Sequence, residues 1–200
     1  MPKAINVTVA KPKKGGAVFR APLGTPLPAS AKDELDKAFK DLGYISTDGV
    51  VNSNSPESES ISAWGGDVVY TYPKSKADTF KMTLIEALNT EVLKTVYGND
   101  NVTGDLENGL SIKANGNQQE ASCFVIDTIL RGNVLQRLVL PNASVTAVGD
   151  ITYADGTVLG YETTLTAALD DDGNTHYDYR IQGDTGKVQK PAGSESEVQA

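Results

Sequence analysis

The stretch TFKMTLIEALNTEVLKTVYG, Thr79–Gly98, changes its periodicity halfway along. Its first part is rich in β-branched, aromatic and apolar residues, which favours a strand over Thr79–Ile85. From Asn89 the apolar residues recur at helical spacing, so we expect Asn89 to cap a short helix that Gly98 ends. An alternative interpretation starts the helix within the strand, at a capping box that begins with Thr83. In either case this is the apolar helix of a chain otherwise patterned as strands and turns, and we expect it to pack against a sheet.

Charge is unevenly distributed along the 200 residues. The chain has 18 basic and 26 acidic residues and a net charge of −8, which argues against a general nucleic-acid-binding surface. Before Asp33 every charged residue is basic: Lys3, Lys11, Lys13, Lys14, Arg20 and Lys32. A basic arm on an acidic body suits contacts between copies of one protein, although a solvated, disordered leader is an equal alternative. We expect a basic N-terminal arm over residues 1–16, a β domain over 17–182 and a flexible tail over 183–200.

The residues that usually carry chemistry are scarce. The single Cys123 excludes a disulfide within the chain and is expected to be a small buried hydrophobic residue. The single His176 lies between a turn and a strand, where we expect an exposed loop residue. No phosphate loop, calcium loop or nucleophile elbow has the required spacing. We therefore expect no enzyme, metal or cofactor. The absence of a signal peptide pattern or a membrane-length apolar run favours assembly in a reducing cytosol.

The first half of the chain alternates between short ordered segments and polar stretches. Expected elements are strands at Ile5–Ala10 and Ala17–Arg20, a short helix over Ala31–Leu42, a long polar loop over Tyr44–Ile61, and a strand over Asp67–Tyr72. We expect Pro73 to end that last strand. A polar loop as long as this one is usually functional or disordered.

The second half reads as strands joined by turns. Expected elements are a strand at Leu110–Lys113, a hairpin of Ala121–Leu130 with Val134–Leu140, a second hairpin of Asp150–Tyr153 with Val158–Thr166 around Asp155-Gly156, and a strand at Tyr177–Ile181. A loop at residues 131–133 would place Phe124 opposite Leu140 and Asp127 opposite Arg137. Because an unpaired carboxylate would be costly if that face is buried, we expect Asp127 and Arg137 to form a cross-strand pair.

Several segments, taken in order, resemble the tail tube proteins (major tail proteins) of phages with long, flexible, non-contractile tails. They are AVFRAPLGTPLP, FKDLGYISTDGV, ISAWGGDVV, the stretch quoted first, and RLVLPNASVTAVGDITYADGTVLGYETTLTAALDDDG, which together cover most of residues 17–182. The specificity of the resemblance comes from the order of the segments, because none of them is a chemical motif.

The resemblance implies a mainly β (α+β) fold, a β-sandwich or half-barrel with a packed helix, a second short helix and long loops. It implies hexameric rings that stack into a siphophage-type tail tube, whose sheets join to line the conduit for genome delivery. DNA would pass through the lumen without specific binding. The implied partners are other copies of the chain, a tape-measure protein, a tail terminator and distal tail proteins. The implied location is the virion tail, after assembly in the host cytoplasm.

Within this framework the long polar segment is a candidate contact loop between rings or subunits, because it ends on the only tryptophan of the chain, a residue type enriched at interface centres. The candidate contact residues are Ser46, Asp48, Asn52, Glu57, Glu59, Trp64, Gly65 and Gly66. The alternative is that Trp64 fills the core of its own domain. A conduit for DNA should repel phosphate weakly, so we also expect an acidic lumen. Candidate lumen acids are Asp67, Glu120, Asp150 and Glu162.

A second hypothesis is a secreted or surface β-sandwich that binds a ligand such as a carbohydrate. Exposed aromatic residues favour it: Trp64, Tyr70, Tyr72, Tyr153, Tyr161, Tyr177 and Tyr179. The missing secretory signal argues against it. An enzyme is the least favoured class.

Overall fold

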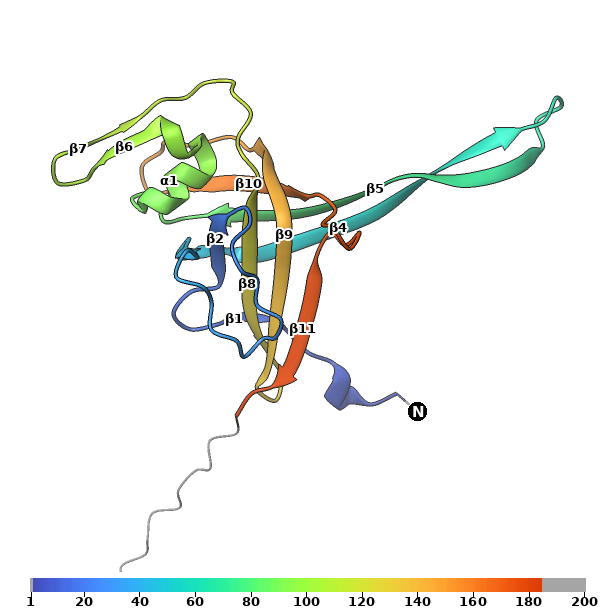
Figure 1. Ribbon diagram of the computed structural model, residues 1–200, viewed down its shortest axis with the longest axis horizontal. Coiled ribbons are helices and arrows are strands. Elements are labelled where there is room, and N and C mark those ends of the chain that lie inside the picture. The colour runs from blue at the N-terminus through green and yellow to red at the C-terminus, as the bar shows by residue number, and fades with distance from the viewer. Residues whose placement is uncertain (1, 185–200) are drawn as a thin grey trace, which may run out of the picture.

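A computed structural model describes residues 2–184 and shows a mainly β chain with one α-helix (Figure 1). The main sheet runs in the order β3-β2-β8-β9-β10-β5-β4, with β1 also paired to β8 and β11 to β9, and β6 and β7 form a separate hairpin. The elements are β1 Lys11–Pro12, β2 Val18–Pro22, β3 Lys40–Asp41, β4 Ile45–Ser62, β5 Val68–Leu84, α1 Thr90–Tyr97, β6 Val102–Asp105, β7 Gly109–Ile112, β8 Ser122–Leu130, β9 Val134–Val148, β10 Tyr161–Ala167 and β11 Tyr177–Gln182, with 3-10 turns at Ala4–Asn6 and Asn99–Asn101. The mainly β fold expected from the sequence is confirmed.

The two ends of the main sheet are joined by a very short connection. Only residues 42–44 separate β3 from β4. The Leu42 N–H donates to the Val18 carbonyl of β2 at 2.9 Å, and the Tyr44 carbonyl accepts from the Ile85 N–H, which follows β5, at 3.1 Å. Because one short segment bonds to both ends, the sheet curls into a half-barrel.

The inner face of the half-barrel carries the main hydrophobic core, and α1 packs against it through Val92, Leu93 and Val96. The Asn89 side chain accepts from the Glu91 N–H at 3.0 Å and caps the helix. Gly98, at φ 97°, ends it. The expected order of strand and then helix is confirmed, and the alternative start near Thr83 is wrong because that residue lies in β5.

A second, smaller core lies on the outer face of β2, β8 and β9, beneath residues 23–39. Phe39 packs there, but the predicted helix over Ala31–Leu42 is wrong, because this segment consists of turns and extended residues. At the start of this segment, the carbonyls of Ser30 and Asp33 accept hydrogen bonds from Arg137 at 3.1 and 2.8 Å. A helix would have used these carbonyls internally.

The same arginine forms the central ion pair of this second core. The predicted β8–β9 register is present, with Phe124 opposite Leu140 and Asp127 opposite Arg137. Arg137 Nε and Nη2 donate to the two Asp127 carboxylate oxygens at 2.7 and 2.8 Å, and both side chains are buried. The Lys13 ammonium lies 3.3 Å from the same carboxylate, so the ion pair joins β8, β9 and the N-terminal segment.

Strand β9 is longer than predicted and has two neighbours on one edge. Its first half pairs with β11 and its end, from Ala143, pairs with β10. The predicted strand over Asp150–Tyr153 is therefore wrong, because β9 continues to Val148 and a loop spans residues 149–160. The strand at Ile5–Ala10 is also absent. Strands β2, β7 and β11 confirm the remaining predicted strands to within a few residues.

The largest correction concerns residues 45–62, which form an 18-residue strand, β4, rather than a polar loop. β4 pairs with β5 from its start to the turn at residues 63–67, with register shifts that include one between Glu57 and Ser58. Pro73 lies within β5 and does not end it. A proline is tolerated there because the outer part of β5 has β4 as its only neighbour, so one edge needs no N–H donor.

A buried carboxylate fixes the place where this hairpin leaves the barrel. Asp78 is fully buried and accepts from Asn52 Nδ2 at 2.7 Å and Thr175 Oγ1 at 2.5 Å, and lies 2.6 Å from His176 Nδ1. His176 also packs edge-on against Phe80. The prediction of an exposed loop histidine is therefore wrong. Burial raises the pKa of the Asp78 carboxyl, but the three hydrogen bonds and the imidazole outweigh it, so the pKa is lowered.

We expect Arg137→Met to destabilise the fold strongly, because it leaves the buried Asp127 carboxylate with only the partly exposed Lys13. Breaking one partner of a buried pair costs about 3–5 kcal/mol. Urea unfolding measures this change. Arg180→Met is the matched control, since its pair with Asp178 is exposed and should change the midpoint little. An equally small effect of both substitutions would contradict the central role of Arg137.

Asp78 should make the root of the hairpin sensitive to acid. Because its folded-state pKa is lowered, its contribution to stability is complete above the ordinary carboxyl range and is lost as the pH falls through the lowered pKa. Unfolding curves between about pH 7 and about pH 3 should therefore show a smaller loss of stability for Asp78→Asn than for the unmodified protein. Parallel pH profiles for the two proteins would exclude this role.

Candidate assembly interface

The most prominent surface feature is an arm formed by residues 55–77, the outer parts of β4 and β5 and the turn between them. β10 pairs with β5 only from Asp78 to Leu84, so the arm has just two strands. It extends far beyond the barrel (Figure 1). A two-stranded hairpin without a third strand or a packed face is marginally stable in water. Its outer edges also present unpaired backbone groups. The arm therefore has the properties of a segment that becomes buried when copies meet.

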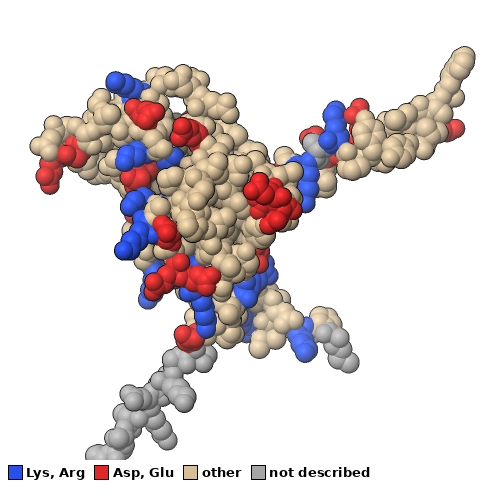
Figure 2. Space-filling model, in the orientation of Figure 1, with Lys and Arg blue, Asp and Glu red and all other residues tan. Residues whose placement is uncertain are grey.

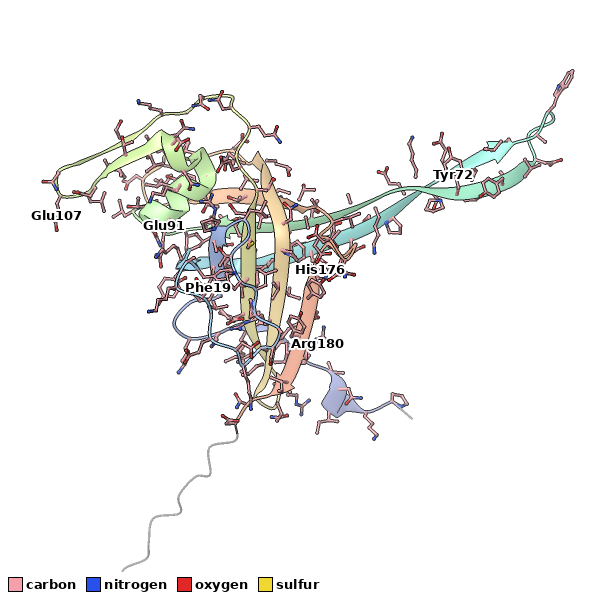
Figure 3. The ribbon with its side chains drawn as sticks, in the orientation of Figure 1. Phe19, Tyr72, Glu91, Glu107, His176 and Arg180 are labelled. Carbon is pink, nitrogen blue, oxygen red and sulfur yellow. The ribbon has the colours of Figure 1, made fainter. Side chains whose placement is uncertain are left out.

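The two faces of the arm differ in chemistry. One face carries Tyr70 and Tyr72, whose rings stack with centroids 6.0 Å apart, next to Glu59 and Ile61. The Tyr72 hydroxyl donates to Glu59 at 3.2 Å, and Lys74 lies 3.3 Å from the same carboxylate. The opposite face has small hydroxyl side chains, with Ser60 and Thr71 hydrogen-bonded at 2.9 Å. Figure 3 shows Tyr72 on the arm and His176 where the arm meets the barrel.

The tip of the arm is apolar and exposed. The turn is closed by hydrogen bonds from Ala63 N–H to the Asp67 carbonyl and from Gly66 N–H to the Ala63 carbonyl, at 2.8 and 3.0 Å. Gly65 has φ 121°, which favours glycine. Trp64 is fully exposed, so it is not part of the core of its own domain. Further exposed apolar residues follow near the tip: Ile61, Val68, Val69 and Tyr70.

The eight candidate contact residues extend along the whole hairpin rather than forming one loop. Ser46 and Asp48 lie at the start of β4 and hydrogen-bond to each other at 3.2 Å. Asn52 is turned toward Asp78 at the root. Glu57 and Glu59 lie on the arm, and Trp64, Gly65 and Gly66 form its tip.

The outer face of the barrel next to the arm is rich in hydroxyl groups. β5, β10 and β9 contribute its side chains: Thr79, Lys81, Thr83, Ser144, Thr146, Glu162, Thr164 and Thr166. We call this set the hydroxyl face. Its two charges form an ion pair, with Lys81 Nζ 2.8 Å from Glu162 Oε1. Thr146 and Thr166 hydrogen-bond across β9 and β10 at 2.8 Å. The intervening side chains of β5 and β10, such as Phe80 and Leu165, face the core.

The four candidate lumen acids lie on four different elements. Asp67 is in the turn at the arm tip, Glu120 precedes β8, and Asp150 is in the loop after β9. Glu162 is the one that lies in a strand of the main sheet, on the hydroxyl face. Figure 2 shows charged side chains gathered along the middle of the arm, an almost uncharged outer end, and mixed charge over the barrel.

Within residues 2–184, no group of three or more His, Cys, Asp or Glu side chains is placed to hold a metal ion. No helix in this part of the chain is long and apolar enough to cross a membrane. Cys123 is buried in the second core, its Sγ is 3.1 Å from the Pro141 carbonyl, and burial raises the pKa of its thiol. The thiolate that nucleophilic chemistry requires is therefore disfavoured.

Sequence reasoning missed Asp78 and His176 as structural residues. Their only signal is an acid placed inside an apolar strand and a histidine after a tight turn, and neither reveals that the two meet across 98 positions.

Comparison with known proteins identifies the family. The sequence matches the family model for phage tail tube proteins over residues 8–193, which is most of the chain. A search of curated proteins finds no match. The expected resemblance is thereby confirmed at the level of phage tail tube proteins, and the secreted ligand-binding module is not supported. The chain belongs to the phage tail tube protein family, whose members are structural, non-enzymatic components of the virion tail.

Proposed function

We propose that this protein assembles into hexameric rings that stack into the tube of a long, flexible, non-contractile phage tail, through which the genome is delivered. Family membership supports a structural role in the tail tube. The observation that carries the proposal is the arm, a two-stranded ribbon with open edges and an apolar tip. In a monomer such a feature is an aggregation hazard, whereas between subunits it is a joint.

In the assembled tail, the partners are further copies of the chain, a tape-measure protein inside the growing tube, a tail terminator and distal tail proteins. Assembly takes place in the host cytoplasm. Contacts between copies also draw on the uneven charge, because every charged residue before Asp33 is basic and the rest of the chain has an acidic excess.

The hydroxyl face supplies the wall of the channel in this proposal. Short hydroxyl side chains offer DNA no fixed cation, and the charge of Lys81 is neutralised by Glu162. Phosphate contacts hold DNA through Lys and Arg, and salt weakens them. A wall whose only lysine is paired therefore lets the duplex slide. Glu120 and Asp150 remain candidates for further acids near the channel, where they would add weak repulsion, whereas Asp67 lies at the arm tip, away from the hydroxyl face.

Trp64→Ala should leave the monomer folded and abolish tube formation, because the side chain is fully exposed in the monomer. Sedimentation and negative-stain microscopy measure assembly, and thermal unfolding checks the fold. Leu106→Ala removes an exposed apolar side chain at the β6–β7 turn, on the other side of the barrel from the arm, and should assemble normally. Normal tubes from Trp64→Ala would show that the arm tip is not a joint.

Glu162→Lys should allow tubes to form but slow genome ejection, most strongly at low salt, because it places two unpaired lysines on the hydroxyl face. Phage carrying the substitution would be tested by ejection rates at several ionic strengths. Glu107→Lys makes the same charge change at the exposed β6–β7 turn and serves as the control. If both variants eject at the unmodified rate at every salt concentration, the hydroxyl face does not line the channel.

A further inference from the structure

A cavity of about 480 Å³ lies beside the start of β4, at the opposite end of that strand from the arm tip. One wall is the backbone around Gly15 and Gly16, and the other is the segment that joins β3 to β4, with the Glu86 side chain between them. A Cβ on Gly16 would meet the Asp41 carboxylate, so the close approach of the two walls requires glycine. Nothing lies within 4 Å of the position that a Cβ on Gly15 would take, so the cavity is open to another molecule on that side.

The rim of this cavity has the Tyr44 ring and Lys14, a lysine without an ion-pair partner among residues 2–184. Tyr44 is 78 % exposed, although its backbone is fixed by hydrogen bonds, and an exposed ring of this kind is suited to stack on an indole. The Asp41 and Glu86 carboxylates are occupied by the Gly43 and Tyr44 N–H groups at 2.8 and 2.9 Å.

The lysines at the rim are not equivalent. Lys13 is paired with Asp127, whereas Lys14 has no ion-pair partner among residues 2–184.

The arm tip has the complementary chemistry. Trp64 is a large exposed aromatic residue, and Asp67, three positions further on, is the acid in the same turn. A cavity of about 480 Å³ lies within the size range of small-molecule pockets, so it has room for an indole ring. Indole insertion would bury the exposed apolar tip, and Asp67 would come to the rim where Lys14 is free.

The tip and the cavity of one chain are too far apart to meet. They lie at opposite ends of β4, which has 18 residues. At about 3.3 Å per residue these ends are separated by roughly 50 Å. The contact must therefore join two copies. It is heterologous, because the arm tip of one copy enters the cavity of another. Contacts of this kind propagate into rings or filaments.

We propose that the Trp64 tip of one subunit inserts into the cavity beside Tyr44 and Lys14 of a second copy of this chain. This rests on the proposed function, since it names the receiving site for the arm. A second cavity, between residues 7–11 and 129–131, offers exposed Val7 and Val9 but no aromatic ring, and it serves below as the comparison site.

The first test uses the fact that Trp64 is the only tryptophan of the chain. Unassembled protein should emit as a water-exposed indole and be quenched freely by acrylamide. On assembly, insertion should shift emission to shorter wavelength and reduce quenching severalfold. Assembled tubes in which Trp64 stays freely quenched would overturn insertion while leaving tube formation itself established.

The second test identifies the receiving cavity by exchanging charges. Lys14→Glu and Asp67→Lys should each raise the protein concentration needed for assembly by roughly three- to tenfold, and the double variant should return close to the unmodified value. Lys37→Glu makes the same charge change on an exposed loop and should have no such effect. A double variant as poor as the two single defects combined would exclude this cavity.

A third measurement places a probe at the cavity itself. Bimane, a dye that tryptophan quenches only at contact, is attached to Tyr44→Cys in a chain whose Trp64 is replaced by phenylalanine; Cys123 is buried and so protected from the reagent. Co-assembly with unmodified chains should quench this dye severalfold, but not the same dye on Val9→Cys. Quenching at position 9 alone would move the site to the second cavity.

These results separate the two proposals. If Trp64→Ala assembles normally, the role of the arm in tube formation fails. If Trp64→Ala is defective but the charge exchange and the Tyr44 probe give no signal, only the docking site fails.

Discussion

The pairing of β5 governs the rest of the molecule. Between Asp78 and Leu84 this strand has a neighbour on both edges, and its side chains alternate between the core and the hydroxyl face. Beyond Asp78 it loses β10, and the sheet becomes a ribbon with only β4 to complete it. A buried carboxylate with three hydrogen-bonding partners stands at this boundary. One strand thus supplies both the stable domain and the exposed arm that we propose as the joint between copies.

Much of the domain was predictable because burial leaves a pattern in the sequence. The helix α1 has an N-cap, an apolar side and a terminal glycine, and each acts over only a few residues. The β8–β9 hairpin was predictable for a similar reason, since its turn residues and alternating apolar side chains set one register. The same register places Asp127 opposite Arg137, so the central ion pair also follows from the local pattern.

The failures occurred where the deciding interaction is distant in sequence, or where a segment has no buried face in the single chain. From Val51 to its end, β4 has neither face buried in a single chain, so this part carries no hydrophobic alternation and its serines and glutamates resemble a loop. Residues 31–42 have helix propensity, but the carbonyl groups of Ser30 and Asp33 accept hydrogen bonds from the Arg137 guanidinium of β9, more than 100 positions away. Local propensity cannot anticipate such a partner. The tip residue Trp64 was recognisable by type, whereas the cavity depends on backbone segments that only the fold brings together.

The prolines and register shifts of the arm bear on whether unassembled subunits aggregate through their strand edges. A long, regular strand edge would pair with the same edge of other copies, and newly made chains would aggregate into fibres. Pro56 lies in β4 and Pro73 in β5, so each strand of the arm has a residue without an N–H donor, and the register shift between Glu57 and Ser58 interrupts the regular ladder. Lateral sticking is thereby discouraged along most of the length. In the proposed tube, subunits would then join mainly at a growing end that presents the complementary contact, so elongation would be faster than spontaneous initiation.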